Sequence, residues 1–164
     1  MAQTRLVLSD ASPLIGLAAA GGFGLLRRIF QSVSITVAVR DEVLLDRTKV
    51  GAPELAVALQ ARWIKVLRRD WKAPVFSTLG PGEASVLRAA VNIGGDCLVL
   101  LDDQAARREA IRLDLHVTGT LGLLIVARRR ELITAVRPYF VRLAERGFHF
   151  SKDLARGLLR GVGE

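Results

Sequence analysis

The chain has 164 residues, of which 51% are hydrophobic, and a formal net charge of +8. This length predicts a single domain over residues 1–164 with a sizeable core, and the hydrophobic content excludes a disordered chain. The lone Cys97 excludes a disulfide framework and a cysteine-based zinc site, and it fits a reducing, cytoplasmic setting. Most of the cations are arginines, which bind phosphate through paired N–H donors. The charge therefore indicates either a nucleic-acid partner or an arginine-rich genome.

An apolar stretch near the N-terminus has some features of a signal sequence. Its uncharged run, Ala11–Leu26, is shorter than the ~18 to 20 residues that cross a bilayer, and it contains Gly and Pro. Asp10 lies just upstream, where a signal sequence would carry basic residues. The stretch therefore predicts a buried helix in a soluble protein with no membrane partner.

Strand and helix patterns alternate from the start of the chain. Leu6–Ser9 is an apolar run that predicts a strand ending at Asp10, and Pro13 then fits the first turn of a helix that reaches about Ala20. The further elements expected in the first half are a helix over Phe23–Phe30, a strand over Val33–Val37, a helix over Ala38–Leu45, a helix over Pro53–Ala61 and an edge strand over Trp63–Leu67.

The second half continues this alternation. After an irregular connection over Arg68–Thr78, a Gly-Pro turn opens a helix that ends at Gly94-Gly95. Asp96–Leu101 is almost continuously apolar, which is typical of a central parallel strand buried on both faces. The remaining expected elements are a helix over Gln104–Leu113, a strand over Leu115–Val117, a helix ending at Arg130, a helix over Leu132–Glu145 and a helix over Lys152–Leu159. The alternation predicts an α/β fold with a parallel, helix-covered sheet.

Five acidic residues occupy strand tips or the first turns of helices that follow strands or Gly-Pro turns. In a parallel α/β sheet such positions meet at one edge, outside the carboxyl ends of the strands. Carboxylates gathered at close range raise one another's pKa unless a cation neutralises them. Mg²⁺ and Mn²⁺ prefer carboxylate and water oxygens, and no histidine or cysteine cluster competes as a ligand set. The five residues are Asp10, Glu42, Glu83, Asp102 and Asp103.

Each of these acids also has a simpler interpretation. Asp10 is suited to capping the helix after it, alone or together with Ser12. Glu42 is suited to a solvated position on a short helix, and Glu83 to a favourable charge at a helix N-terminus. The adjacent aspartates at the end of the central strand are suited to a cap and its neighbour. The joint arrangement, rather than any single residue, favours a site.

Four segments carry these residues in a recognisable order and spacing: Ser9–Leu17, Gly82–Ser85, Leu101–Arg107 and Gly119–Leu124. Together they resemble the PIN-domain family, and within it the VapC-like, toxin-type branch of small prokaryotic proteins. The resemblance covers the chain from about Leu6 to its end. It implies a three-layer α/β/α sandwich around a parallel sheet of about four or five strands, with a metal-dependent ribonuclease site.

The resemblance also implies roles for individual residues. The family's first acid falls on Asp10, with a small hydroxyl residue nearby at Ser12, the second on Glu42 and the third on Glu83. The fourth falls within the Asp102-Asp103 pair. Asp10, Glu83 and this pair would hold Mg²⁺ or Mn²⁺, and Glu42 would position the metal or its water for attack on an RNA phosphodiester.

Two features leave alternatives open. Many PIN domains carry Thr-x-Asp where this chain has Leu101-Asp102-Asp103, so either aspartate, or both, is a candidate ligand. Thr120 either supplies a hydroxyl to the site or caps its helix. Arg40 and Arg107 flank the acidic motifs and either contact RNA or form part of a solvated helix face.

The leading hypothesis is a Mg²⁺- or Mn²⁺-dependent endoribonuclease that serves as the toxin of a toxin–antitoxin pair. A small cognate antitoxin would block its acidic pocket, and the protein would form a homodimer. Helices from about residue 132 onward are candidates for the dimer or partner contact. The alternative hypothesis is a non-catalytic PIN-like module that binds RNA or a protein.

Overall fold

The structure is a computed structural model that describes residues 5–164. Within these residues five parallel strands form one sheet in the order β3-β2-β1-β4-β5. The strands are β1 (Leu6–Ser9), β2 (Val33–Thr36), β3 (Ile64–Leu67), β4 (Cys97–Leu100) and β5 (His116–Thr118). The predicted parallel sheet is confirmed, with β3 at one edge as expected.

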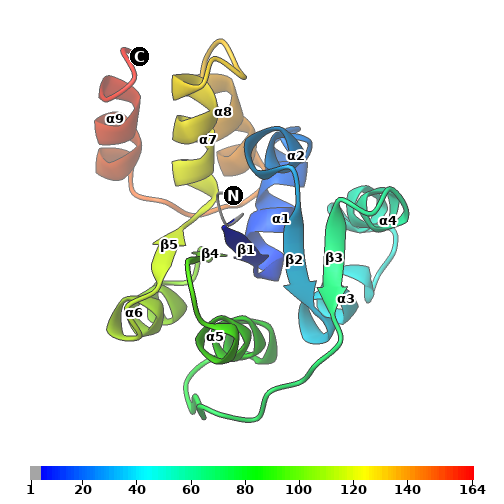
Figure 1. Cartoon of the computed structure of the whole chain (residues 1–164). Helices are drawn as coiled ribbons and strands as arrows, with labels where there is room; N and C mark the ends of the chain where they lie inside the picture. The colour runs from blue at the N-terminus through cyan, green and yellow to red at the C-terminus, as the bar shows by residue number, and fades with distance from the viewer. Residues whose placement is uncertain (1–4) are drawn as a thin grey trace.

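Helices cover both faces of the sheet. They are α1 (Ala11–Ala19), α2 (Leu25–Phe30), α3 (Val37–Leu44), α4 (Ala52–Gln60), α5 (Pro81–Ile93), α6 (Gln104–Arg112), α7 (Thr120–Arg129), α8 (Arg137–Glu145) and α9 (Lys152–Arg160). Figure 1 shows α5 and α6 on one side of the sheet and α1, α2 and α7 on the other. The fold is therefore the expected three-layer α/β/α sandwich.

Strands β1 and β4 lie side by side in the interior of the sheet. Leu8, Val99 and Leu100 have no exposed surface, because helices cover both faces at this position. The chain moves from β1 outward through β2 to β3, then returns to β4 on the other side of β1. The junction of β1 and β4 is thus a point where the winding direction of the sheet reverses. Ligands of open α/β sheets bind outside the carboxyl ends of the strands at such a point.

The helix predicted over Leu132–Glu145 is shorter than expected. The prediction was wrong for its first turn, because α8 begins only at Arg137. Glu131 has a positive φ of 57°, and the amide of Leu132 donates to the carbonyl of Ala127 to close the end of α7. Pro138 has no amide hydrogen to donate and is accommodated in the first turn of α8 rather than in a helix interior.

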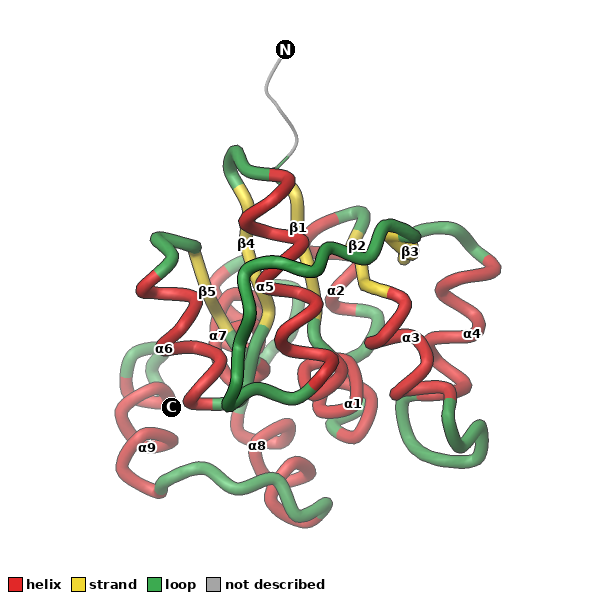
Figure 2. The backbone as a smooth tube through the Cα atoms, turned by 90° about the horizontal axis from the view of Figure 1, so that it is seen from below, coloured by secondary structure: helices red, strands yellow, loops and turns green. Residues whose placement is uncertain are grey.

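The connection between β3 and α5 is a long loop, drawn in green in Figure 2, that crosses the α5 side of the molecule. Side chains of α5 hold it in place: Arg88 Nε donates to the carbonyl of Pro74 at 3.0 Å, and Asn92 Nδ2 donates to that of Ala73 at 2.7 Å. The loop leads into the N-terminus of α5 and so helps to set where the acidic first turn of that helix lies.

No helix within residues 5–164 combines the length and the apolar character that a membrane span requires.

Candidate active site

Asp10 lies at the carboxyl end of β1, beside the end of β4. Its amide donates to the carbonyl of Leu100 at 3.0 Å, so the backbone of β4 positions it. The residue is only 3% exposed, although it carries a carboxylate. It occupies the cap position of α1 but accepts no capping hydrogen bond, and its Oδ1 atom is buried without a hydrogen-bond partner. Asp10 therefore makes no capping hydrogen bond of normal geometry, although the amides of Ala11 and Ser12 lie close enough to favour its charged form.

Glu42 approaches Asp10 from α3. That helix starts directly after β2, where the hydroxyl of Thr36 accepts a hydrogen bond from the amide of Val39. A methyl group placed on Gly82 would lie 2.7 Å from Glu42 Oε2 and 2.9 Å from Asp10 Oδ1. The two carboxylates therefore face a single point that stays open only because residue 82 has no side chain.

Glu83 comes from the same turn of α5 as Gly82. Its Oε2 atom accepts a hydrogen bond of 2.7 Å from the amide of Gly80, so the carboxylate also caps the helix N-terminus. Its charge acts on both Asp10 and Glu42. We call Asp10, Glu42 and Glu83 the acidic cluster.

Burial and like charges alter the proton affinity of the acidic cluster. Burial raises the pKa of Asp10 from its ordinary 3.8 to about 7. The amide of Ala11 lowers this pKa in part, the charges of Glu83 and Glu42 raise it further, and the amide of Ser12 lowers it slightly. The pKa of Glu42 is also raised, by burial and then by Glu83. The cluster therefore favours binding of a positive charge, whether a proton or a metal cation.

Asp102 follows β4 and is held in a different set of contacts. Its Oδ1 accepts a hydrogen bond of 2.7 Å from the amide of Thr120, and its Oδ2 accepts one of 2.6 Å from the Thr120 hydroxyl. A side chain on Gly119 would lie 2.6 Å from Asp102 Oδ1, so glycine is needed for this approach. The contact joins the end of β4 to the start of α7. The Thr120 hydroxyl thus binds Asp102 rather than capping its own helix.

Asp103 is an N-cap. It is exposed, and its Oδ1 accepts a hydrogen bond of 2.8 Å from the amide of Ala106 in the first turn of α6. The interpretation of the aspartate pair as a cap and its neighbour therefore describes their contacts in this structure, with Asp102 serving α7 and Asp103 serving α6.

The other predicted residues lie around these acids. Arg107 Nη1 donates to the carbonyl of Leu101 at 3.0 Å and so braces the segment that carries Asp102. Arg40 makes an ion pair with the neighbouring Asp41, at 2.7 Å between Nη2 and Oδ1. Ser12 is half-buried in the first turn of α1, next to Asp10.

A divalent cation fits part of this arrangement. Oxygen atoms of two carboxylates, the unpartnered Oδ1 of Asp10 and Oε2 of Glu42, border the open point above Gly82. Both are hard donors of the kind that divalent cations prefer. Within residues 5–164, no three or more Asp, Glu, His or Cys side chains are already arranged as a closed ligand set. The structure thus divides the five predicted acids between a cluster at Gly82 and two helix-capping aspartates.

Gly82 is the residue of this site that the sequence analysis missed. Glycine is unfavourable in a helix, yet it occupies the first turn of α5 immediately before an acidic residue. That unfavourable placement is the one local signal that could have pointed to a close approach.

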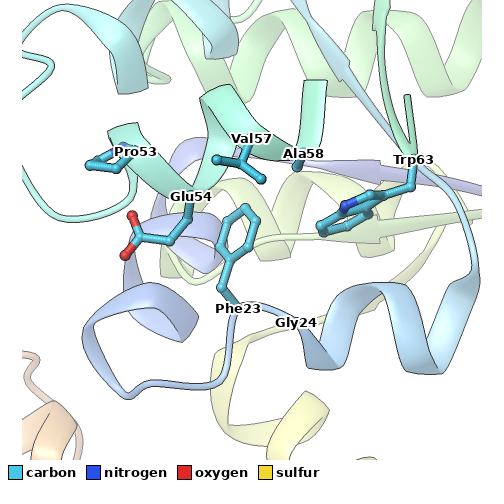
Figure 3. A pocket seen from close by; sticks show the side chains of 7 residues that line it. All are labelled: Phe23, Gly24, Pro53, Glu54, Val57, Ala58 and Trp63. Atoms are coloured by element: carbon cyan, nitrogen blue, oxygen red, sulfur yellow. The ribbon is translucent and has the colours of Figure 1, made fainter. Parts of the chain in front are cut away.

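A hollow lies away from the acidic cluster, between α4 and the turn after α1 (Figure 3). It has a volume of about 410 Å³ and is lined by apolar side chains including Phe23, Val57 and Trp63, with Glu54 at its rim. Phe23 and Trp63 meet edge to face, with ring centroids 5.7 Å apart. None of the predicted site residues lines this hollow, so it is not part of the candidate active site.

Comparisons with known proteins agree with this architecture. The sequence model of a family described as DUF3368, a PIN domain, matches residues 6–164. Among solved structures, a PilT N-terminus domain protein from the hyperthermophilic archaeon Sulfolobus solfataricus superimposes with a TM-score of 0.58 at 15% identity. The match covers 75% of this chain and 93% of that protein, and at this identity it shows a shared fold. No curated protein matches the chain.

Proposed function

Because the chain belongs to the PIN-domain family, whose members are generally nucleases, we propose that it is a Mg²⁺- or Mn²⁺-dependent endoribonuclease. The observation that carries this proposal is the buried Asp10 carboxylate, whose Oδ1 has no hydrogen-bond partner and faces Glu42 across the open point at Gly82. A buried carboxylate oxygen without a partner is costly, and the nearby charge of Glu42 adds to that cost. A divalent cation at this point accounts for the arrangement.

The acidic cluster would hold the cation. Asp10 and Glu42 direct oxygens at the point above Gly82. Glu83 adds a third carboxylate, one oxygen of which already accepts a hydrogen bond from the Gly80 amide. A bound divalent cation supplies an activated water and stabilises the charge that develops on the phosphate during hydrolysis.

Asp102 and Asp103 would have supporting roles. Both oxygens of Asp102 are engaged with Thr120, which fixes the loop beside the acidic cluster, and Asp103 caps α6. Asp102 remains a candidate outer ligand because it lies at the carboxyl end of β4, next to Asp10 in the sheet. In this proposal Arg107 and Ser12 position the site, while Arg40 and the general positive charge attract the RNA backbone.

A toxin role, a small antitoxin, a homodimer and a cytoplasmic location complete the proposal. They rest on the resemblance to the toxin-type branch. The C-terminal helices support a contact with a second chain, because Val141 on α8 and Leu154 on α9 are 49% and 48% exposed. Light scattering on the purified protein tests the homodimer, and a small neighbouring reading frame whose product blocks cleavage would support the toxin role.

The test of the enzyme proposal is cleavage of single-stranded RNA with Mg²⁺, with Mn²⁺ and with EDTA. Wild type is expected to cleave only with a metal, and Asp10→Asn and Glu42→Gln are expected to lose cleavage while remaining folded. Asp41→Asn is the matched control, since Asp41 adjoins Glu42 on α3 but pairs with Arg40 at the surface. Metal-dependent cleavage that survives in Asp10→Asn would contradict the proposal.

The absence of a closed ligand set within residues 5–164 favours one alternative, a PIN-like module that binds RNA without cutting it. The same assay separates the two functions. A wild-type protein that binds RNA in EDTA but leaves it intact with either metal is the result expected for the binding module.

A further inference from the structure

A cavity of about 540 Å³ lies next to the acids at the end of β4. Its walls come from the first turns of α6 and α7, the end of β5, and the C-terminal segment from the end of α8 into α9. Figure 1 shows α9 at the same end of the molecule as α7, and residues of both helices line the cavity. Asp102 and Thr120 line the cavity and are also the residues that join β4 to α7.

Three consecutive aromatic rings line the cavity. Phe148, His149 and Phe150 all contribute to its wall, and none is buried. The two phenylalanines are held by packing: Phe150 lies against Phe140 with ring centroids 5.6 Å apart, and Phe148 lies next to the position of Gly16 on α1. His149 is exposed, so its imidazole face is available to a ligand. Aromatic rings of this kind stack on nucleobases.

Polar groups also line the cavity. Gln104 offers both a donor and an acceptor, the Thr118 hydroxyl offers either, and the Arg107 guanidinium retains donors beyond the one it gives to Leu101. The edges of nucleobases present mixed donors and acceptors, and such side chains can read them.

Gly16 links the cavity to the acidic cluster. It lies on α1, the helix that Asp10 begins, and a methyl group on it would be 2.9 Å from the Thr120 hydroxyl and 3.2 Å from the Phe148 ring. Phe148 therefore packs against the helix that begins directly after Asp10. Asp102 lines the cavity and follows β4, whose end lies beside that of β1 and Asp10, so RNA with a phosphate at the acidic cluster would have a neighbouring base near this cavity.

We propose that this cavity is a base-binding subsite that receives one unpaired nucleobase of single-stranded RNA. The inference rests on the proposed function, because it assigns RNA as the substrate. It adds that the segment 148–150 binds a base and so contributes to the choice of cleavage site. A base within a duplex is stacked between its neighbours and cannot enter such a cavity without leaving the helix.

The lining favours a base over a free phosphate or a purely apolar partner. A phosphate site would be rich in cations and backbone donors, whereas here the aromatic segment and leucines such as Leu121 and Leu143 face one cation, Arg107, and the carboxylate of Asp102. A purely apolar partner would leave the polar side chains of Gln104 and Thr118 without hydrogen-bond partners.

The two histidines of the chain make a direct test possible. His149 lines the cavity, and His116 is exposed at the start of β5 and does not line it. Ring resonances of both are followed by ¹H–¹³C NMR in EDTA while ribonucleoside 5′-monophosphates are added, with ribose 5-phosphate as the control without a base. Nucleotides are expected to shift the His149 signals and leave the His116 signals unchanged. Ribose 5-phosphate is expected to shift the signals of neither histidine. Equal shifts with ribose 5-phosphate, equal shifts at His116, or no shift at millimolar nucleotide would each overturn the proposal.

Binding of a labelled single-stranded oligoribonucleotide in EDTA supplies the second readout. His149→Ala is expected to weaken binding about tenfold, while His116→Ala leaves it unchanged. Both residues are exposed, so both variants are expected to fold. Equal affinity for a duplex of the same sequence, or an unchanged affinity of His149→Ala, contradicts the subsite. Because no cleavage is measured, these results are independent of whether the metal-dependent reaction is found.

Discussion

The charge of Asp10 is expected to destabilise the metal-free protein at neutral pH. Folding raises the pKa of this carboxyl from 3.8 to about 7, chiefly through burial, so the folded protein binds this proton more tightly than the unfolded chain does. Stability is therefore unaffected below pH ~4, where both states are protonated, and falls as the pH rises from ~4 to ~7. The total loss of unfolding free energy over this pH range is about 4 kcal/mol, at 1.36 kcal/mol per pKa unit.

Asp10→Asn removes this charge with little change of shape. The variant is expected to be more stable than wild type above pH 7, by up to about 4 kcal/mol. Its advantage should grow by about 2.5 kcal/mol between pH 5 and pH 8. Urea unfolding of both proteins in EDTA at several pH values measures this difference. Asp41→Asn is again the control, because it loses only a surface ion pair worth about 0–1 kcal/mol.

A bound metal should reduce the stability advantage of Asp10→Asn at neutral pH. Mg²⁺ at a hundred times its dissociation constant would stabilise wild type by about 2.7 kcal/mol and leave Asp10→Asn almost unchanged. The reasoning is refuted if the stability difference between Asp10→Asn and wild type is the same at pH 5 and pH 8 in EDTA. That result would mean that the Asp10 carboxylate is not penalised in the folded state.

Three further predictions concern neighbouring residues. Gly82→Ala is expected to lose metal-dependent cleavage and stabilisation by Mg²⁺, because its methyl group fills the point between the Asp10 and Glu42 carboxylates. Its unfolding free energy in EDTA is expected to stay within about 1 kcal/mol of that of wild type. A fully active variant would show that no cation binds at this point. Asp102→Ala is expected to lower the unfolding free energy by about 1–3 kcal/mol, because it leaves the Thr120 amide and hydroxyl without an acceptor. Asp102→Asn is expected to retain most of the wild-type unfolding free energy, because the side-chain amide of asparagine can accept from one group and donate to the other. Equal losses for the two variants in urea unfolding would contradict the hydrogen-bonding role. Glu164→Ala is expected to cost about 1–2 kcal/mol, because Glu164 accepts hydrogen bonds of 2.7 and 2.9 Å from the amides of Val136 and Arg137 at the start of α8, and an unchanged thermal midpoint would rule out that cap.

The sheet of this protein was predictable because its signals are local. Leu6–Ser9 and the apolar run that ends at Leu101 are bounded by turn residues and acids, and burial on both faces leaves such runs continuous. The first turn of α8 was mispredicted because the apolar pattern continues through residues 132–136, which form bends before the helix begins at Arg137. Apolar periodicity alone does not distinguish such bends from a first helical turn.

The candidate site was predictable only as a set of positions. Strand order and the ends of parallel strands bring Asp10 and Asp102 to one edge of the sheet, as their place after apolar runs predicts. The sequence does not determine which of these acids remain without hydrogen-bond partners. Asp103 finds a donor three residues along the chain, which is a local event, whereas Asp102 finds its donors eighteen residues away at Thr120.

The sequence by itself therefore determined that acids would gather at the carboxyl edge of a parallel sheet, since strand ends and helix starts are encoded within a few residues. The tertiary structure decided which acids face one another. Asp10 and Glu42 converge because α5 packs against α3 at a glycine, and that approach depends on the missing side chain of Gly82 rather than on any pattern within either helix. Burial then leaves Asp10 Oδ1 without a partner, which makes this carboxylate the candidate centre of the site.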